Sequence, residues 1–137
     1  MHTVLAYLMF LLTGMVMQAQ NTVEVSLGDF RNDNGHVRVG LYNSPDSFLD
    51  KTYKSVQSEI SNKEATVTFE DLPDGIYAIS CYHDEDSNGQ LNMRFGMFPS
   101  EPYGCSNNAR GFFGPPKWED AMFELKNGEL RKLDIKM

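Results

Sequence analysis

Cysteine and histidine are scarce in this sequence, which has two of the first and three of the second among 137 residues. A zinc triad needs three converging ligands of these types, and a catalytic dyad needs a nucleophile with a neighbouring base. His2 and His36 lie far along the chain from His83, and neither cysteine stands in a known nucleophile pattern with a histidine. The sequence therefore identifies no catalytic site.

Positive charge is also in short supply. Twelve Lys and Arg against nineteen Asp and Glu give a net charge of −7 and a pI near 4.8. Such a chain repels phosphate groups, which argues against a nucleic-acid partner and against anionic lipid surfaces. The balance fits a cation-binding protein or simply a soluble one.

Long apolar runs are absent except at the N-terminus, where one extends from Val4 to Met17. It is shorter than the roughly 20 residues of a spanning helix and ends in small and polar residues, which is typical of a secretory signal peptide cut after Ala19. Because no Lys or Arg precedes the run, an uncleaved anchor is the alternative. We expect residues 1–19 to be a signal peptide and residues 20–137 a single exported domain, periplasmic or extracellular, with no membrane span.

Short segments of alternating apolar and polar side chains fill most of the remaining chain. This period of two is typical of half-buried strands, and turn residues separate the segments. We expect hairpins between residues 22–27 and 36–42 and between residues 121–125 and 130–135, with further strands near residues 53–60, 65–69 and 76–83. The pattern predicts an all-β fold, an immunoglobulin-like or transthyretin-like antiparallel β-sandwich of about seven strands.

The segment from Met93 to Lys117 has no strand or helix period and is rich in Gly, Pro, Asn and aromatic residues. Loops of this length are often functional. Aromatic rings beside amides and a guanidinium could bind a small molecule, a glycan or a protein. In the alternative, the rings plug one end of the sandwich and the polar groups satisfy the loop backbone. The candidate ligand-binding residues are Tyr103, Asn107, Asn108, Arg110, Phe112, Phe113 and Trp118.

An acidic loop follows the strand that ends at His83. From Asp84 onward, oxygen-bearing side chains occupy alternate positions and a glycine stands sixth, which is the first half of a calcium loop. The alternative is a plain hairpin turn, since Asn-Gly favours one strongly. The candidate metal ligands are Asp84, Asp86, Asn88, Gln90 through its backbone carbonyl, and Asn92.

The calcium loop is incomplete, because Phe95 stands at the twelfth position, where a bidentate Glu is needed. Glu101 or Glu119, from beyond the loop, could complete the site. So few ligands predict weak calcium binding, with a Kd of ~10⁻⁴–10⁻³ M. We interpret the chain as a non-enzymatic binding or structural module, and the alternative is an envelope-associated metal-dependent enzyme that uses His83.

Cys81 and Cys105 are the only candidates for a disulfide. Export would place them where disulfides persist, and one bridge would contribute ~3 kcal/mol. Two separate buried thiols are the other possibility. The spacing leaves both open.

Several longer segments of the chain together carry a resemblance to a known family. The segments are Phe30-Arg-Asn-Asp-Asn-Gly, Val37-Arg-Val-Gly-Leu-Tyr-Asn-Ser, Phe69-Glu-Asp-Leu-Pro-Asp-Gly-Ile-Tyr-Ala, Tyr82-His-Asp-Glu-Asp-Ser-Asn-Gly-Gln-Leu-Asn and Tyr103-Gly-Cys-Ser-Asn-Asn-Ala-Arg-Gly-Phe-Phe-Gly-Pro-Pro. They resemble the bacterial family called domain of unknown function 2141, over about Val23 to Ile135. The resemblance implies an exported bacterial domain, and it implies no catalytic or binding residues. Family members tend to end the acidic loop with Asp where this chain has Asn92, which lowers the charge available to a cation.

Overall fold

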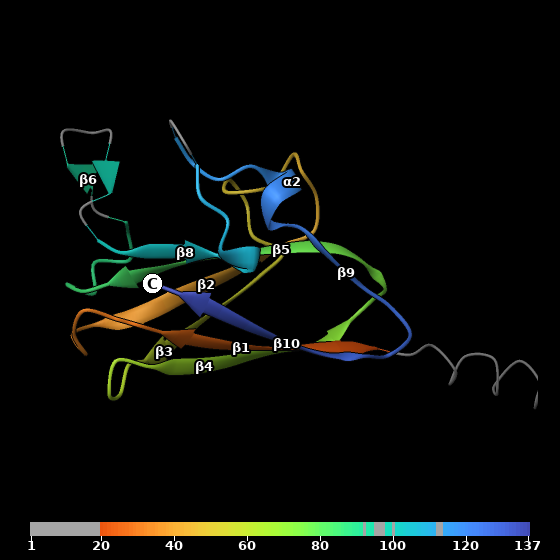
Figure 1. Ribbon diagram of the computed structural model, residues 1–137, viewed down its shortest axis with the longest axis horizontal. Coiled ribbons are helices and arrows are strands. Elements are labelled where there is room, and N and C mark those ends of the chain that lie inside the picture. Colours follow the sequence, from red (N-terminus) through yellow and green to blue (C-terminus); the bar gives the residue numbers. More distant parts are fainter. Residues whose placement is uncertain (1–19, 92, 95–97, 100, 112–113) are drawn as a thin grey trace, which may run out of the picture.

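Two β-sheets packed face to face form the fold of this protein, shown in Figure 1 as a computed structural model. It describes residues 20–91, 93–94, 98–99, 101–111 and 114–137, so the predicted signal peptide lies outside the described residues. The predicted all-β sandwich is confirmed, with eight strands in the two sheets rather than about seven. None of the helices in this part of the chain is long and apolar enough to cross a membrane.

The three-stranded sheet has the order β10-β1-β4, and the five-stranded sheet has the order β3-β2-β5-β8, with β9 paired to β5. Strands β6 and β7 form a separate ribbon. The elements are β1 (Asn21–Gly28), β2 (His36–Tyr42), β3 (Lys54–Glu59), β4 (Ala65–Leu72), β5 (Gly75–Asp84), β6 (Met93–Arg94), β7 (Phe98–Pro99), β8 (Tyr103–Cys105), η1 (Ser106–Asn108), α2 (Trp118–Ala121), β9 (Phe123–Leu125) and β10 (Leu130–Lys136).

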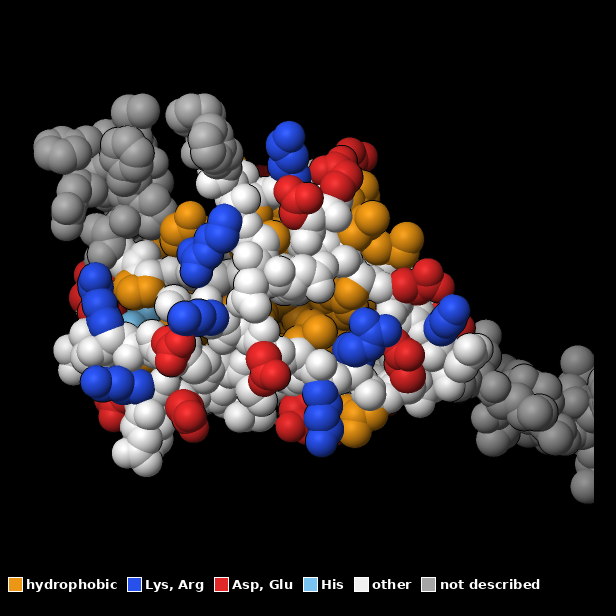
Figure 2. Space-filling view, viewed as in Figure 1, with side chains coloured by type: hydrophobic (Ala, Val, Ile, Leu, Met, Phe, Trp, Pro, Cys, Tyr) orange, Lys and Arg blue, Asp and Glu red, His pale blue; other side chains and the backbone are white. Residues whose placement is uncertain are grey.

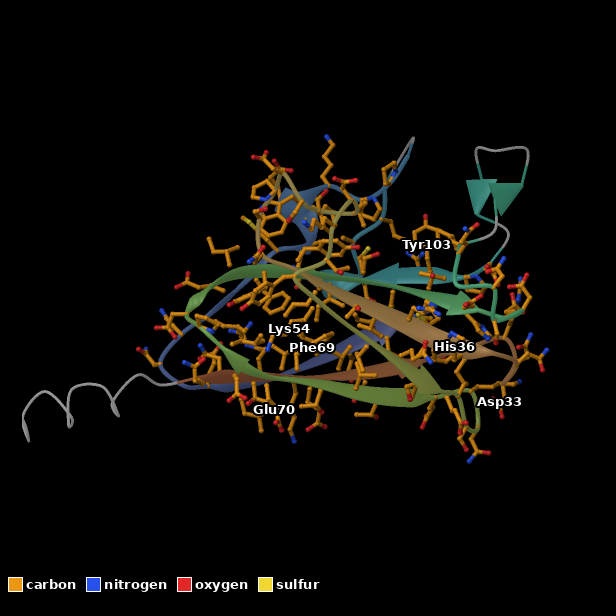
Figure 3. The ribbon with its side chains drawn as sticks, turned by 180° about the vertical axis from the view of Figure 1, so that it is seen from behind. Asp33, His36, Lys54, Phe69, Glu70 and Tyr103 are labelled. Carbon is orange, nitrogen blue, oxygen red and sulfur yellow. The ribbon has the colours of Figure 1, made fainter. Side chains whose placement is uncertain are left out.

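The alternation in the sequence places one face of each long strand in the interior. Val23, Val25 and Leu27 of β1 are at most 2% exposed, while the residues between them are half-buried. On β4, Phe69 points between the sheets (Figure 3). Each such apolar side chain contributes roughly 1.5–3 kcal/mol by leaving water, so the main core holds the two sheets together.

Both predicted hairpins are wrong. Strand β1 pairs with β4 and β10, whereas β2 pairs with β3 and β5, so residues 29–35 cross between the sheets. Likewise β9 pairs with β5, and β10 runs parallel to β1, a departure from a purely antiparallel sandwich. Alternation shows which side chains are buried but not which strand lies alongside.

A second, smaller core covers part of the outer face of the five-stranded sheet. It contains Ala78, Cys105, Ala109 and Ala121, with Trp118 packed against it. The segment predicted to have no regular structure supplies β8, which hydrogen-bonds to β5, and η1. Elements of three residues are too short to show a period, so the sequence pattern missed them.

The two cysteines lie on opposite faces of this sheet. Cys81 pairs with Gly104 and belongs to the main core, whereas Cys105 pairs with Ser80 and belongs to the second core. Paired residues share a face and consecutive residues alternate, so the thiols point apart. Both are free and buried, and the disulfide considered from the sequence is absent.

Candidate functional site: the acidic cluster

His83 and Asp84 are the last two residues of β5, and their side chains point to opposite faces of the sheet, as consecutive side chains of a strand do. His83 is fully buried, its ring lies edge-on to Phe30 at 5.1 Å, and its Nε2 is 2.6 Å from the carbonyl oxygen of Asn34. A carbonyl oxygen only accepts, so Nε2–H donates. His83 is therefore a packed core residue and does not share a site with the acidic loop.

Asp84 is fully buried on the other side of β5 and accepts several hydrogen bonds. The N–H groups of Gly89 and Asn88 donate to it at 2.8 Å and 3.1 Å, and Arg38 Nε lies 3.4 Å away. Burial alone would raise the pKa of Asp84, but these donors, together with the Asp86 carboxyl, outweigh it and leave the pKa below its usual value. Asp84 therefore stays ionised in the fold.

Asp84, Asp86 and Glu101 bring three carboxylates together. One oxygen from each lies within 4.8 Å of the others, and two of the side chains are buried. Glu101 is 5% exposed and accepts the backbone N–H of Glu85 at 2.7 Å, which fixes the segment before β8 against the acidic loop. Converging carboxylate oxygens are the ligand set of a hard divalent cation.

The acidic loop contains a tight turn, but it is not the plain hairpin turn of the alternative interpretation, because β5 pairs with β8 and β6 pairs with β7. Asn88 Oδ1 accepts the N–H of Gln90 at 2.9 Å, and Gly89 has a φ of 77°, as expected of a tight loop. Asn92 lies outside the described residues. Of the two acids considered from beyond the loop, Glu101 joins the cluster, whereas Glu119 is exposed on α2.

A network of contacts holds the acidic loop against residues 29–35. Arg31 Nε and Asn32 Nδ2 donate to Glu85 Oε2 at 3.0 Å and 2.8 Å, and a second guanidinium nitrogen of Arg31 donates to Oε1. The hydrogen bond from Arg31 holds the pKa of Glu85 below its usual value, against the effect of burial. On β2, His36 Nε2 lies 3.3 Å from Asp84 Oδ2. His36 thus adjoins the cluster because it pairs with Asp84 across β2 and β5, and this pairing was not predicted from the sequence.

The asparagines of the long segment bond to backbone groups. Asn107 Nδ2 donates to the carbonyl oxygens of Asp120 and Met122, and Asn108 Oδ1 accepts the N–H of Lys136. These are the contacts expected if the polar side chains satisfy the loop backbone. Their binding of a ligand stays a prediction.

Two of the aromatic residues predicted to bind a ligand, Tyr103 and Trp118, contact other side chains of the protein. Arg110 lies over the ring of Tyr103 at 5.4 Å and donates to its carbonyl oxygen at 3.3 Å, while Trp118 lies edge-on to Phe48 at 5.7 Å in the second core. The predicted ligand-binding residues Phe112 and Phe113 lie outside the described residues. Tyr103 and His36 lie toward the same end of the molecule (Figure 3).

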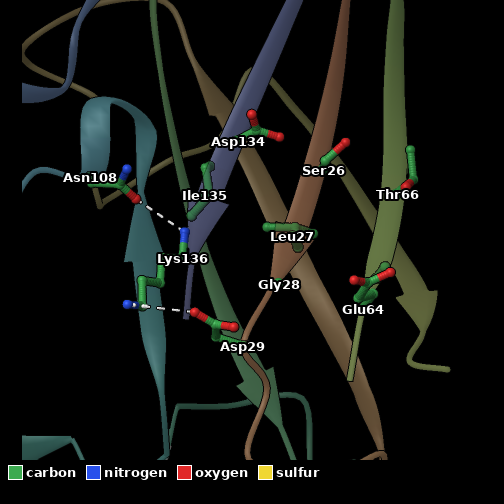
Figure 4. A pocket seen from close by; sticks show the side chains of 11 residues that line it. Ser26, Leu27, Gly28, Asp29, Glu64, Thr66, Asn108, Asp134, Ile135 and Lys136 are labelled. Carbon is green, nitrogen blue, oxygen red and sulfur yellow. Dashed lines mark hydrogen bonds and ion pairs between the residues drawn. The ribbon is translucent and has the colours of Figure 1, made fainter. Parts of the chain in front are cut away.

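A pocket of about 320 Å³ lies near the C-terminal ends of β1 and β10 (Figure 4). Glu64 and Asp134 line it together with an ion pair between Asp29 and Lys136, whose carboxylate oxygen and Nζ are 3.6 Å apart. Charges of both signs are interspersed over the face of the molecule in Figure 2. This pocket has no converging set of ligands like that of the acidic cluster.

Fold and site define a small all-β sandwich with an acidic cluster at the end of its longest strand. Residues 25–132 match the bacterial family described as "Uncharacterized protein conserved in bacteria (DUF2141)", and the chain belongs to this family. No curated protein matches the chain, and no solved structure does.

Proposed function

We propose that this protein is an exported, non-enzymatic binding module whose acidic cluster holds calcium. The supporting observation is the convergence of Asp84, Asp86 and Glu101 within 4.8 Å. Carboxylates this close repel one another unless positive charge lies near them, and Arg38 pairs with Asp84 at one side of the cluster. A divalent cation bound between the three carboxylates would reduce their mutual repulsion.

All-oxygen ligands favour calcium over transition metals, which prefer imidazole or thiolate. Calcium also tolerates an irregular loop better than magnesium, which demands an octahedron. Asn88, Gln90 and Asn92 remain proposed additional oxygen ligands. With three carboxylates at most, we expect a Kd of ~10⁻⁴–10⁻³ M, which suits the millimolar calcium of an extracellular site.

Thermal unfolding in EDTA, calcium and magnesium tests the proposal. At about 1 mM calcium and a Kd of about 0.1 mM, linkage gives about 1.4 kcal/mol, or a rise of several degrees in Tm. Asp86→Asn and Glu101→Gln should abolish the rise, whereas Glu119→Gln, an exposed acid outside the cluster, should retain it. No calcium-dependent rise in the unsubstituted protein would refute the calcium site.

The competing hypothesis is a transition-metal site in which His36, beside Asp84, supplies a ligand. Zinc or manganese that survives dialysis, and is lost in His36→Gln, would point to a transition-metal site and to the metal-dependent enzyme alternative. Export has its own test, since the N-terminal apolar run supports cleavage after Ala19. Mass spectrometry of protein recovered from the producing cells should then give a chain beginning at Gln20.

A further inference from the structure

The outer face of the five-stranded sheet lies open beside the second core. Side chains of directly paired residues share a face, so rows of residues cross from β3 through β2 to β5. Two rows reach the open part of this face. They are Ser55, Gly40 and Ser80, and next to them Gln57, Arg38 and Tyr82.

These two rows line a groove of about 410 Å³, a size within the range of small-ligand sites, roughly 300–1,000 Å³. Gly40 forms part of the floor. A Cβ there would lie 2.7 Å from Thr52 Cγ2 and 3.3 Å from Tyr42 Oη, so a larger residue would require the Thr52 side chain to move. Hydroxyl groups, one amide and one guanidinium line the groove, and no carboxylate is among its lining residues.

Arg38 is the charged residue of this groove, and its side chain is 40% exposed. Its Nε faces Asp84, the one hydrogen-bonding partner it has among the described residues. A guanidinium carries five N–H groups and binds a carboxylate through two of them. The N–H groups of Arg38 that do not face Asp84 can therefore bind the carboxylate of a ligand, in a groove that has no carboxylate among its lining residues.

The acidic loop adjoins the groove. Tyr82 Oη donates to the carbonyl oxygen of Gly89 at 3.0 Å, and a Cβ on Gly89 would lie 3.6 Å from Arg38 Nη2. The groove and the acidic cluster thus share one electrostatic environment.

We propose that this groove binds a uronic acid, with its carboxylate on Arg38 and its hydroxyls on Ser55, Ser80 and Gln57. One guanidinium matches one carboxylate, and a polyanion would meet repulsion from the nearby acidic cluster. Hydroxyl and amide groups both donate and accept, as sugar hydroxyls do. A cation bound to Asp84 would neutralise the carboxylate that Arg38 now faces. The positive charge of Arg38 would then be available to the carboxylate of the ligand. This coupling rests on the proposed calcium site.

NMR titration of the full chain with D-glucuronate, in calcium and in EDTA, tests the proposal. D-glucose and acetate are the matched ligands, since each lacks one half of the proposed recognition. Glucuronate should shift amide signals of β2, β3 and β5 and should bind more tightly in calcium. Arg38→Gln should weaken binding about tenfold or more. Arg131→Gln, which removes an arginine paired to Glu129 outside both the groove and the acidic loop, should bind as the unsubstituted protein does.

Equal binding of glucose and glucuronate, or tight binding to Arg38→Gln, would overturn the proposal. Gln57→Ala is a second variant, at an exposed position where the fold should survive, and it should also weaken binding. Melting the same samples separates the two proposals. A calcium-dependent rise in Tm without glucuronate binding overturns the groove alone, whereas glucuronate binding that is equal in calcium and EDTA overturns the coupling.

Discussion

Gly35 offers the sharpest test of how the acidic loop is held. It has a φ of 62°, and a Cβ at this position would lie 2.0 Å from the carbonyl oxygen of Asp84 and 2.8 Å from that of Glu85. Both atoms are backbone, so a side-chain rotation cannot relieve the contact. We therefore expect Gly35→Ala to force residues 29–35 away from the end of β5.

The magnitude follows from two contributions. An alanine in the left-handed region costs about 1–2 kcal/mol. Relieving the contact also requires a displacement of about 1 Å, which would break hydrogen bonds such as those from His83 to the Asn34 carbonyl and from Asn32 to Glu85, at about 1 kcal/mol each. We expect Gly35→Ala to lower the free energy of unfolding by about 3–4 kcal/mol, a large share of the stability of such a domain.

Gly89→Ala is the matched control, because Gly89 also has a positive φ but a Cβ there meets only the flexible end of Arg38, at 3.6 Å. It should lose about 1–2 kcal/mol. Urea denaturation followed by tryptophan fluorescence measures both variants, since the chain has one Trp. Equal losses in the two variants would show that the close approach of Gly35 to Asp84 is not as described and would refute the reasoning.

The remaining predictions concern charge and thiols. The pKa of Glu85 is lowered in the fold, so its contribution to stability is present above the unfolded value, about 4.3, and is lost as pH falls through the folded value. Urea midpoints between pH 3 and 7 should show this loss, and Arg31→Gln should flatten it; an unchanged profile would contradict the role of that ion pair. Burial raises the pKa of both Cys81 and Cys105, so Ellman's reagent should label neither thiol in the native protein at pH 8 and both after unfolding. Labelling of a native thiol would contradict the burial.

Strand positions were predictable from the sequence because burial alternates with a period of two. For that reason the predicted segment 36–42 coincides with β2, and the predicted segment 65–69 lies within β4. Strand partners were not predictable from this pattern. Two strands show the same alternation whether they pair in one hairpin or, as with β1 and β2, lie in opposite sheets and meet in the core. The missed strand β8 is three residues long and owes its place to pairing with β5.

The candidate site was half visible in the sequence. Asp84 and Asp86 stand close together in the chain, and local turn chemistry brings their carboxylates to one side of the loop. Glu101 comes from another segment and was only one of two acids considered, because its position depends on how β8 docks on β5. His83 was a candidate for the site only in the enzyme alternative, and strand alternation sends its side chain into the core instead.

The contacts of Glu85 and Glu101 bear on how strongly a cation would bind. Three carboxylates on a mobile loop would have to be ordered by the ion, and that ordering entropy would be subtracted from the affinity. Here Glu85 is held by Arg31 and Asn32, and its N–H is held by Glu101. The loop is thus ordered by bonds that do not involve the cation. Arg31→Gln should therefore weaken calcium binding even though Arg31 would not touch the ion. In this variant the ion itself would have to order the loop, and that entropy cost would lower the affinity.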